Sequence, residues 1–182
     1  MSRLFPAIAA CALLLSLVSG CSHYRLGTST PLPFATLYVA PTTLKILLPQ
    51  AQAITTAQIR AAFLHDSRIT LVNSPDAADA ILEVEISDYR RDVATQRRDD
   101  TGLARKFTLN LITRCTLKDN RSGKTYFTHR EVSVRRDAYT DSQLSLPSGT
   151  EVSGQLQAEF QTFPLLADAL AGKVAHAVLD VW

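Results

Sequence analysis

The sequence predicts an α+β domain, a two-layer sandwich in which two helices pack on one face of a mixed or antiparallel sheet of four to five strands. Apolar and polar residues alternate over residues 82–86 and 107–117, which indicates half-buried strands. A polar, turn-forming run at 119–124 then joins the second of these strands to a third. Near the C-terminus, apolar residues recur at steps of three and four, which is typical of an amphipathic helix. Each element therefore has one apolar face, and placing both helices on one side of the sheet buries all of these faces.

The first twenty-one residues have the features of an export signal. One basic residue, Arg3, precedes an uncharged run from Phe5 to Val18, and Ser19 and Gly20 lead into Cys21. The run is shorter than the ~20 residues that a membrane-spanning helix needs. A small pair followed by a cysteine resembles the bacterial lipobox, in which diacylglycerol is attached to the cysteine sulfur and the chain is cut before it. We therefore expect a signal peptide at 1–20, a lipid-anchored tether at 21–33 and one domain at 34–182. The N-acyl diacylglyceryl lipid on Cys21 is the only cofactor expected.

The elements at the start of the domain follow in order. Residues 34–39 read as a first strand that ends before Pro41. Residues 49–65 contain no glycine and carry an apolar stripe, which predicts a helix. Residues 68–72 predict a short second strand, closed by the turn-forming residues at 73–75.

The middle of the chain predicts three further strands. Residues 82–86 and 107–117 are the first two, and residues 125–136 return as the hairpin partner of the second. The polar stretch at 91–104 is expected to be a loop. If the first two strands are neighbours, the outward-facing acids Glu83 and Glu85 face two basic residues across the sheet, namely Arg114 and Lys118.

The C-terminal segment predicts the second helix. Residues 137–150 read as a loop, and Thr150 or Ser153 is a candidate N-cap. The apolar stripe runs from Leu165 to Val181. Because proline suits the first turn of a helix better than its interior, Pro164 suggests that the run at 151–163 is a separate or kinked piece.

Charge is unevenly distributed along the chain. Residues 90–136 contain 13 basic and 5 acidic side chains, whereas residues 137–182 contain 1 basic and 6 acidic. Such a separation favours a polyanion or an oppositely charged protein surface as partner, or else a solvent-facing sheet that is rich in basic residues. Six basic residues flank the expected loop and form the candidate polyanion site: Arg90, Arg91, Arg97, Arg98, Arg105 and Lys106. Arginine binds phosphate in a bidentate fashion. The alternatives are that these residues pair with Asp92, Asp99 and Asp100, or that the contact lies on the last strand at Arg130, Arg135 and Arg136.

Catalytic residues are not indicated. The four histidines, His23, His65, His129 and His176, lack the paired spacing of a metal site. Cys115 shares one strand face with Leu111 and Thr113, which predicts a buried, inert thiol rather than a nucleophile. No catalytic set of acid, base and nucleophile is found, so we expect no enzymatic activity and no metal.

Several segments together resemble the LptE family of lipopolysaccharide-assembly lipoproteins. They are CSHYRLG (21–27), FLHDSRITLV (63–72), PDAADAILEVEISDYRRD (75–92), FTLNLITRCTLKDNRSGKTYF (107–127) and FPLLADALAGKVAHAVLDVW (163–182). The order and spacing of the segments carry this resemblance rather than any one motif.

The resemblance implies a non-enzymatic lipoprotein that is held in the outer membrane by its lipid and faces the periplasm. Its implied partners are lipopolysaccharide and an LptD-like β-barrel, which it helps to assemble and to supply with lipopolysaccharide for the outer leaflet. It implies no nucleic-acid partner. The alternative is a lipoprotein that scaffolds another envelope complex without contacting lipopolysaccharide.

Overall fold

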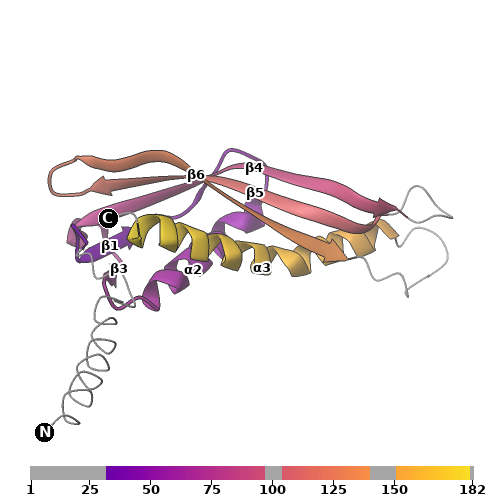
Figure 1. Ribbon diagram of the computed structural model, residues 1–182, viewed down its shortest axis with the longest axis horizontal. Helices are drawn as coiled ribbons and strands as arrows, with labels where there is room; N and C mark the ends of the chain where they lie inside the picture. The colour runs from indigo at the N-terminus through magenta and orange to yellow at the C-terminus, as the bar shows by residue number, and fades with distance from the viewer. Residues whose placement is uncertain (1–31, 97–103, 140–150, 181–182) are drawn as a thin grey trace, which may run out of the picture. The chain divides into compact units, whose positions relative to one another are not determined.

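The computed structural model of the protein describes residues 32–96, 104–139 and 151–180. These residues form one sheet with two helices on one of its faces, as Figure 1 shows. The predicted α+β sandwich is confirmed. The sheet contains six strands, more than the four to five expected, and one of them is only two residues long.

The first half of the domain alternates strands and helices. Its elements are β1 (Thr36–Val39), β2 (Thr43–Leu44), α2 (Pro49–Leu64), β3 (Thr70–Val72) and the short 3-10 helix η2 (Pro75–Ala77). The helix predicted at 49–65 is therefore confirmed, and Pro49 occupies its first turn, where a missing N–H costs no hydrogen bond. β1 pairs in parallel with β3 on one side and with β4 on the other, and α2 is the connection between β1 and β3.

The second half contains a meander of three long strands. They are β4 (Ala80–Gln96), β5 (Ala104–Asp119) and β6 (Thr125–Tyr139), and the order across the sheet is β3-β1-β4-β5-β6, with β2 also paired to β4. β5 pairs antiparallel with both neighbours. The hairpin between β5 and β6 is confirmed, and Gly123 adopts the positive φ of 70° that its turn requires.

The expectation of a loop at 91–104 is wrong over much of that range. β4 continues to Gln96 and β5 begins at Ala104, and the two strands stay paired along this extension. Polar residues are tolerated here because the outer face of the sheet carries no helix, so alternate positions of β4 face solvent. The expected loop at 137–150 is likewise too long, because β6 continues to Tyr139.

The last element is the helix α3 (Glu151–Leu179), which contains Pro164 in its interior. The sequence suggested that the run before Pro164 is a separate or a kinked piece. The expectation of a separate piece is wrong, because one helix spans both segments. An interior proline costs ~3 kcal/mol because it removes one backbone hydrogen bond. Burial on both sides of the proline offsets this cost, with Phe163 at 7% and Leu166 at 0% exposed.

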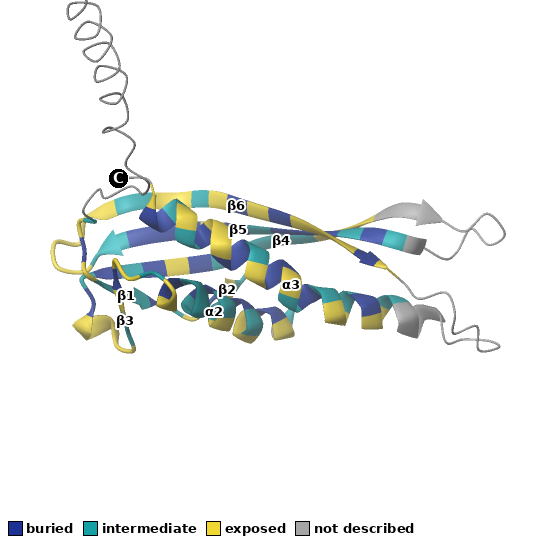
Figure 2. Cartoon of the chain, turned by 60° about the horizontal axis from the view of Figure 1, so that its bottom comes forward, coloured by how far each residue is buried: buried dark blue, intermediate teal, exposed yellow. Residues whose placement is uncertain are grey.

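The core lies between the inner sheet face and the two helices, and Figure 2 marks the buried residues of these elements in dark blue. Cys115 is fully buried there, as predicted, and burial raises the pKa of its thiol to about 11. The thiol is therefore protonated and inert at neutral pH. The other inward residues of β5 are also buried: Phe107, Leu109, Leu111, Thr113 and Leu117.

Two arginines donate hydrogen bonds to carbonyl groups at the C-terminal end of α3, where these groups lack partners within the helix. Arg130 donates to the carbonyl oxygen of Ala177 at 2.6 Å and lies 3.9 Å from the ring centre of Phe127. Arg68 donates to the carbonyl oxygen of Leu179 at 3.3 Å. These contacts tie the helix end to the sheet and to the segment before β3.

At the same end of the sheet, Asp79 joins β1 to the start of β4. Its carboxylate accepts hydrogen bonds from the backbone N–H groups of Ala35 and Thr36 at 3.1 and 3.0 Å. The pKa of Asp79 is lowered, chiefly by the backbone hydrogen bond from Thr36 and further by the Thr36 side chain.

Candidate functional site

The predicted basic site lies toward the far end of the long strands, away from β1 and β3. Arg90 and Arg91 are adjacent in β4, and Lys106 lies near the start of β5. Arg105 is in β5, but its side chain is outside the described part of the chain, as are Arg97 and Arg98 altogether. Cys21 also precedes the first described residue. The structure therefore places three of the six candidate side chains.

Each of these three has an acidic partner. Arg90 contacts Asp88 at 2.6 Å, and Lys106 contacts Asp137 at 2.8 Å, which raises the pKa of the lysine and lowers that of the aspartate. These partners differ from Asp92, Asp99 and Asp100, which the sequence suggested. Because Lys106 pairs with Tyr139 and Thr108 with Asp137 across the hairpin, its register alone places Lys106 beside Asp137.

The third candidate, Arg91, belongs to a cluster on the inner face. Its guanidinium lies 3.3 Å from one carboxylate oxygen of Glu159 in α3, and the Tyr89 hydroxyl donates to the other at 2.6 Å. The Tyr89 ring meets Phe163 edge-on, with centres 6.2 Å apart. Burial is the main cause of a raised pKa at Tyr89. Sequence reasoning missed Glu159 because it lies on a helix that is far away along the chain.

The register brings four arginines into two neighbouring rows across the sheet. Arg90 is level with Asn110 and Arg135, on the outer face. Arg91 is level with Leu109 and Arg136, on the inner face. We call Arg90, Arg91, Arg135 and Arg136 the arginine rows.

Arg135 and Arg136 are the most available members of these rows. Both are exposed, and neither forms an ion pair with another described residue. Between Arg90 and Arg135, Asn110 is only 8% exposed, and its side-chain oxygen has no hydrogen-bond partner within residues 32–96, 104–139 and 151–180. Arg130, the third alternative on β6, is instead held by the end of α3.

The outer face as a whole carries both acidic and basic residues. Lys118 contacts Glu83 at 2.7 Å, as predicted from the strand pattern, whereas Glu85 contacts Lys45 at 3.0 Å although it is level with Arg114. Exposed pairs of this kind contribute little to stability. Among the described residues, Arg135 and Arg136 are adjacent basic side chains that have no acidic partner.

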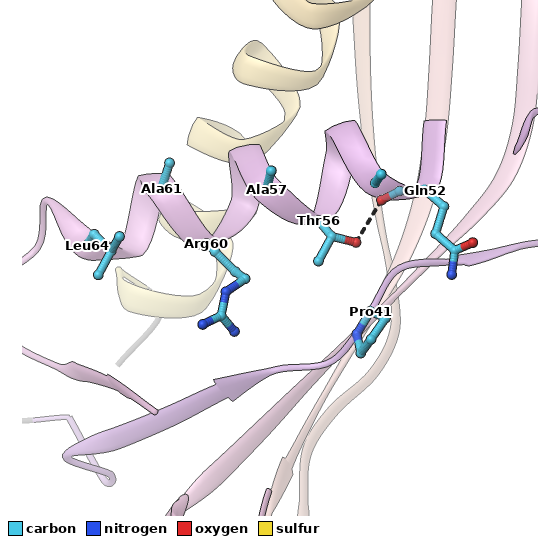
Figure 3. Close-up of a pocket in the computed structure, with 8 residues that line it drawn as sticks. Pro41, Gln52, Thr56, Ala57, Arg60, Ala61 and Leu64 are labelled. Carbon is cyan, nitrogen blue, oxygen red and sulfur yellow. Dashed lines mark hydrogen bonds between the residues drawn. The ribbon is translucent and has the colours of Figure 1, made fainter. Parts of the chain in front are cut away.

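A separate groove of about 590 Å³ runs along the outer side of α2 (Figure 3). Small side chains and Pro41 line most of it, and Thr56 donates to the carbonyl oxygen of Gln52 at 2.7 Å. It contains one basic side chain, Arg60, which contacts Asn73 at 2.5 Å. Nothing in it resembles a catalytic set.

No cluster of His, Cys, Asp and Glu suited to a metal ion occurs among the described residues. One helix in this part of the chain, Gln155–Leu179, is long and apolar enough to cross a membrane, with a mean hydropathy of 1.2. Half of that stretch is buried inside the fold, and the core helix of a domain in solution has the same composition.

Solved structures with this architecture include bacterial lipoproteins. The solution structure of the uncharacterized lipoprotein B from Nitrosomonas europaea is similar with a TM-score of 0.50 and 15% identity, over 85% of this chain and 91% of that one. The protein XCC0632 from Xanthomonas campestris is similar with a TM-score of 0.52 and 13% identity, over 82% and 86%. At these identities the likeness defines the class of fold, a two-helix α+β domain.

The family follows from the sequence itself. The family model for LptE, described as lipopolysaccharide-assembly, matches residues 34–178, and the chain belongs to this family. No curated protein matches the chain. The resemblance inferred from the sequence segments is thus confirmed, and the chain is a member of a lipopolysaccharide-assembly family.

Proposed function

We propose that this protein is an outer-membrane lipoprotein that forms a complex with an LptD-type β-barrel, assists assembly of that barrel and helps deliver lipopolysaccharide to the outer leaflet. The observation that carries the proposal is the family match over residues 34–178, which spans every element of the fold from just before β1 nearly to the end of α3. In this proposal Cys21 carries the lipid anchor and the domain faces the periplasm.

The arginine rows support a lipopolysaccharide contact. Lipid A phosphates are anionic, and a guanidinium offers two parallel N–H groups to one phosphate. Arg135 and Arg136 have no acidic partner among the described residues, so binding there breaks no ion pair with them. Contact at Arg90, Arg91 or Lys106 has to displace the acids they meet. We therefore place the first contact at Arg135 and Arg136, with Arg97, Arg98 and Arg105 as neighbouring candidates.

Depletion in cells tests the role as a whole. Loss of the protein is expected to lower the amount of assembled barrel and of surface lipopolysaccharide, both measured in outer-membrane fractions. Cys21→Ala is expected to release the protein into the periplasm, because the anchor contributes ~0.8 kcal/mol for each buried CH₂ group. Unchanged barrel and unchanged surface lipopolysaccharide after depletion support a scaffold of another envelope complex instead.

Two matched double variants test the lipopolysaccharide contact. Arg135→Gln with Arg136→Gln removes two charges from the arginine rows, and Arg114→Gln with Lys124→Gln removes two exposed charges elsewhere. Binding of the purified protein to lipopolysaccharide is expected to weaken, and to depend less on salt, in the first variant only. Equal binding by both variants contradicts this placement.

A further inference from the structure

β6 lies at one edge of the sheet, and no other strand in the described part of the chain pairs with its free side. It contains 15 residues, whereas β3 at the opposite edge contains three. An edge strand presents a row of unpaired backbone N–H and C=O groups, which can pair with a strand of another chain. Strands in globular proteins are mostly about five to six residues long, so β6 is a long edge.

Two parts of this edge are protected by β6 itself. Toward the hairpin, His129 has a positive φ of 49°, and the register of the β5–β6 pairing shifts at this point. Such a bulge twists a strand and interrupts regular pairing. Toward the other end, Arg135, Arg136 and Asp137 are adjacent and exposed, and charged side chains on an edge disfavour pairing. The residues between these two parts lack both kinds of protection.

The uncharged stretch at 132–134 is the part of the edge that most favours an added strand. Val132 and Val134 are buried on the inner face, and valine suits a strand. The Thr113 hydroxyl donates to the Val132 carbonyl oxygen at 3.0 Å, so this carbonyl group faces β5. Successive residues of a strand in an antiparallel pair direct their backbone groups to opposite sides. The N–H and C=O groups of Ser133 therefore face the free edge.

One side chain from α3 reaches into the middle of this stretch. The Lys173 ammonium donates to the Ser133 carbonyl oxygen at 2.8 Å. A backbone N–H of an added strand would bind the same oxygen at about 2.9 Å, so the ammonium fills the place that such a strand needs. Lys173 is the only lysine or arginine in residues 137–182. The one basic side chain of this segment is thus placed at the exposed edge.

We propose that Lys173 blocks the β6 edge and prevents β6 of a second copy of this chain from pairing with it. A strand that adds here has to displace the ammonium or bury it, and burying an unpaired charge is costly. This inference concerns association of the chain with itself, so it depends neither on the barrel nor on lipopolysaccharide.

The sequence of the edge favours a second copy as the strand that is excluded. Two antiparallel copies centred on Ser133 place Val132 of each copy opposite Val134 of the other. They also place Arg135 opposite Glu131, and neither residue forms an ion pair with another described residue. The pairing is limited to 131–135, because the next residues to meet on each side are basic, Arg130 and Arg136.

The test uses the full-length lipoprotein purified in detergent, with its protein mass measured by light scattering over a range of concentrations. Lys173→Met removes the ammonium and keeps a side chain of similar length and helix propensity, so the melting temperature is expected to be retained. Lys118→Met is the control, because Lys118 contacts Glu83 at 2.7 Å on the outer face of the sheet. We expect the dimer dissociation constant to fall at least tenfold in Lys173→Met and to stay at the wild-type value in Lys118→Met.

Hydrogen exchange and a conservative variant locate the contact. Amides in residues 131–135 are expected to exchange more slowly in the Lys173→Met dimer, because edge N–H groups become paired. Lys173→Arg still offers N–H donors to the Ser133 carbonyl group and is expected to associate no more than the wild type. A wild-type mass for Lys173→Met at every concentration overturns the proposal. Association of Lys118→Met or Lys173→Arg to the same extent, or a dimer with unchanged exchange at 131–135, also overturns it, since each assigns association to another cause.

Discussion

The two halves of α3 share one helix but have opposite surroundings. From Leu166 to Leu179 the apolar side of the helix is buried against α2 and the sheet. Arg130 and Arg68 bind the last carbonyl groups of the helix. From Gln155 to Leu165 only Ala158 and Phe163 are buried, and Glu159 provides the polar tie to β4. The difference teaches that the second half supplies most of the buried surface of the helix, while the first half leaves Leu156, Phe160 and Leu165 exposed.

The largest expected loss of stability comes from a substitution in the buried second half of α3. Leu170→Ala removes a fully buried side chain, so the free energy of unfolding is expected to fall by ~2–5 kcal/mol. Leu165→Ala, at a residue that is 60% exposed on the same helix, is expected to change it by less than about 0.5 kcal/mol. Urea unfolding followed by circular dichroism measures both. Similar losses for the two variants contradict the comparison.

A smaller loss is expected where β6 holds the end of α3. Arg130→Gln removes a charged hydrogen bond to the Ala177 carbonyl group and the stacking on Phe127, which together are worth ~1.5–3 kcal/mol. Arg135→Gln on the same strand is the matched control and is expected to remain within about 0.5 kcal/mol of the wild type. An unaltered unfolding midpoint for Arg130→Gln refutes a structural role for this arginine.

At Asp79 the expected effect depends on pH. Because hydrogen bonding lowers its pKa in the folded state, the carboxylate stabilises the fold above the unfolded pKa of about 3.9, and this contribution is lost as the pH falls through the folded value. Asp79→Asn is therefore expected to be less stable than the wild type near neutral pH, with the difference closing below about pH 4. Asp76→Asn, at an exposed residue of η2, is the control. A pH-independent difference at Asp79 assigns the loss to packing instead.

The smallest global effect is expected at Glu159. Glu159→Gln weakens the tie of the first half of α3, so amide hydrogen exchange is expected to accelerate over residues 155–163 while residues 166–179 stay protected. Because the substitution affects local opening only, we expect it to change the free energy of unfolding by ~1 kcal/mol or less. Mass-spectrometric exchange distinguishes the two halves directly, with Asp168→Asn as an exposed control. Uniform acceleration along α3 shows that the helix behaves as one unit.

Sequence reasoning predicted the elements whose patterns are local. Alternation revealed β4 and β5, and helix composition revealed α2 almost to the residue. It failed where distant parts of the chain decide the structure. β4 runs past Arg91 because β5 pairs with it and Glu159 meets its inner face. Pro164 stays inside α3 because burial on both sides outweighs the local preference of proline.

The candidate site was likewise predicted only in part from the sequence. The basic content of residues 90–136 was visible in the sequence, and strand register explains why Arg90 and Arg135 are level across the sheet. Which arginines remain without an acidic partner depends on side chains from another strand and from α3. Composition alone therefore indicated a basic region, but it did not single out Arg135 and Arg136.

α3 follows every strand of the sheet along the chain, and this order bears on how the domain folds. A polypeptide is synthesised from its N-terminus. Because β4, β5 and β6 pair with their neighbours in sequence, we expect this meander to form early. The helix that covers β5 and β6 is the last to appear. Until then Phe107, Leu109 and Leu111 face water and invite aggregation. We therefore expect a chain that stops before residue 151 to aggregate unless a chaperone binds it.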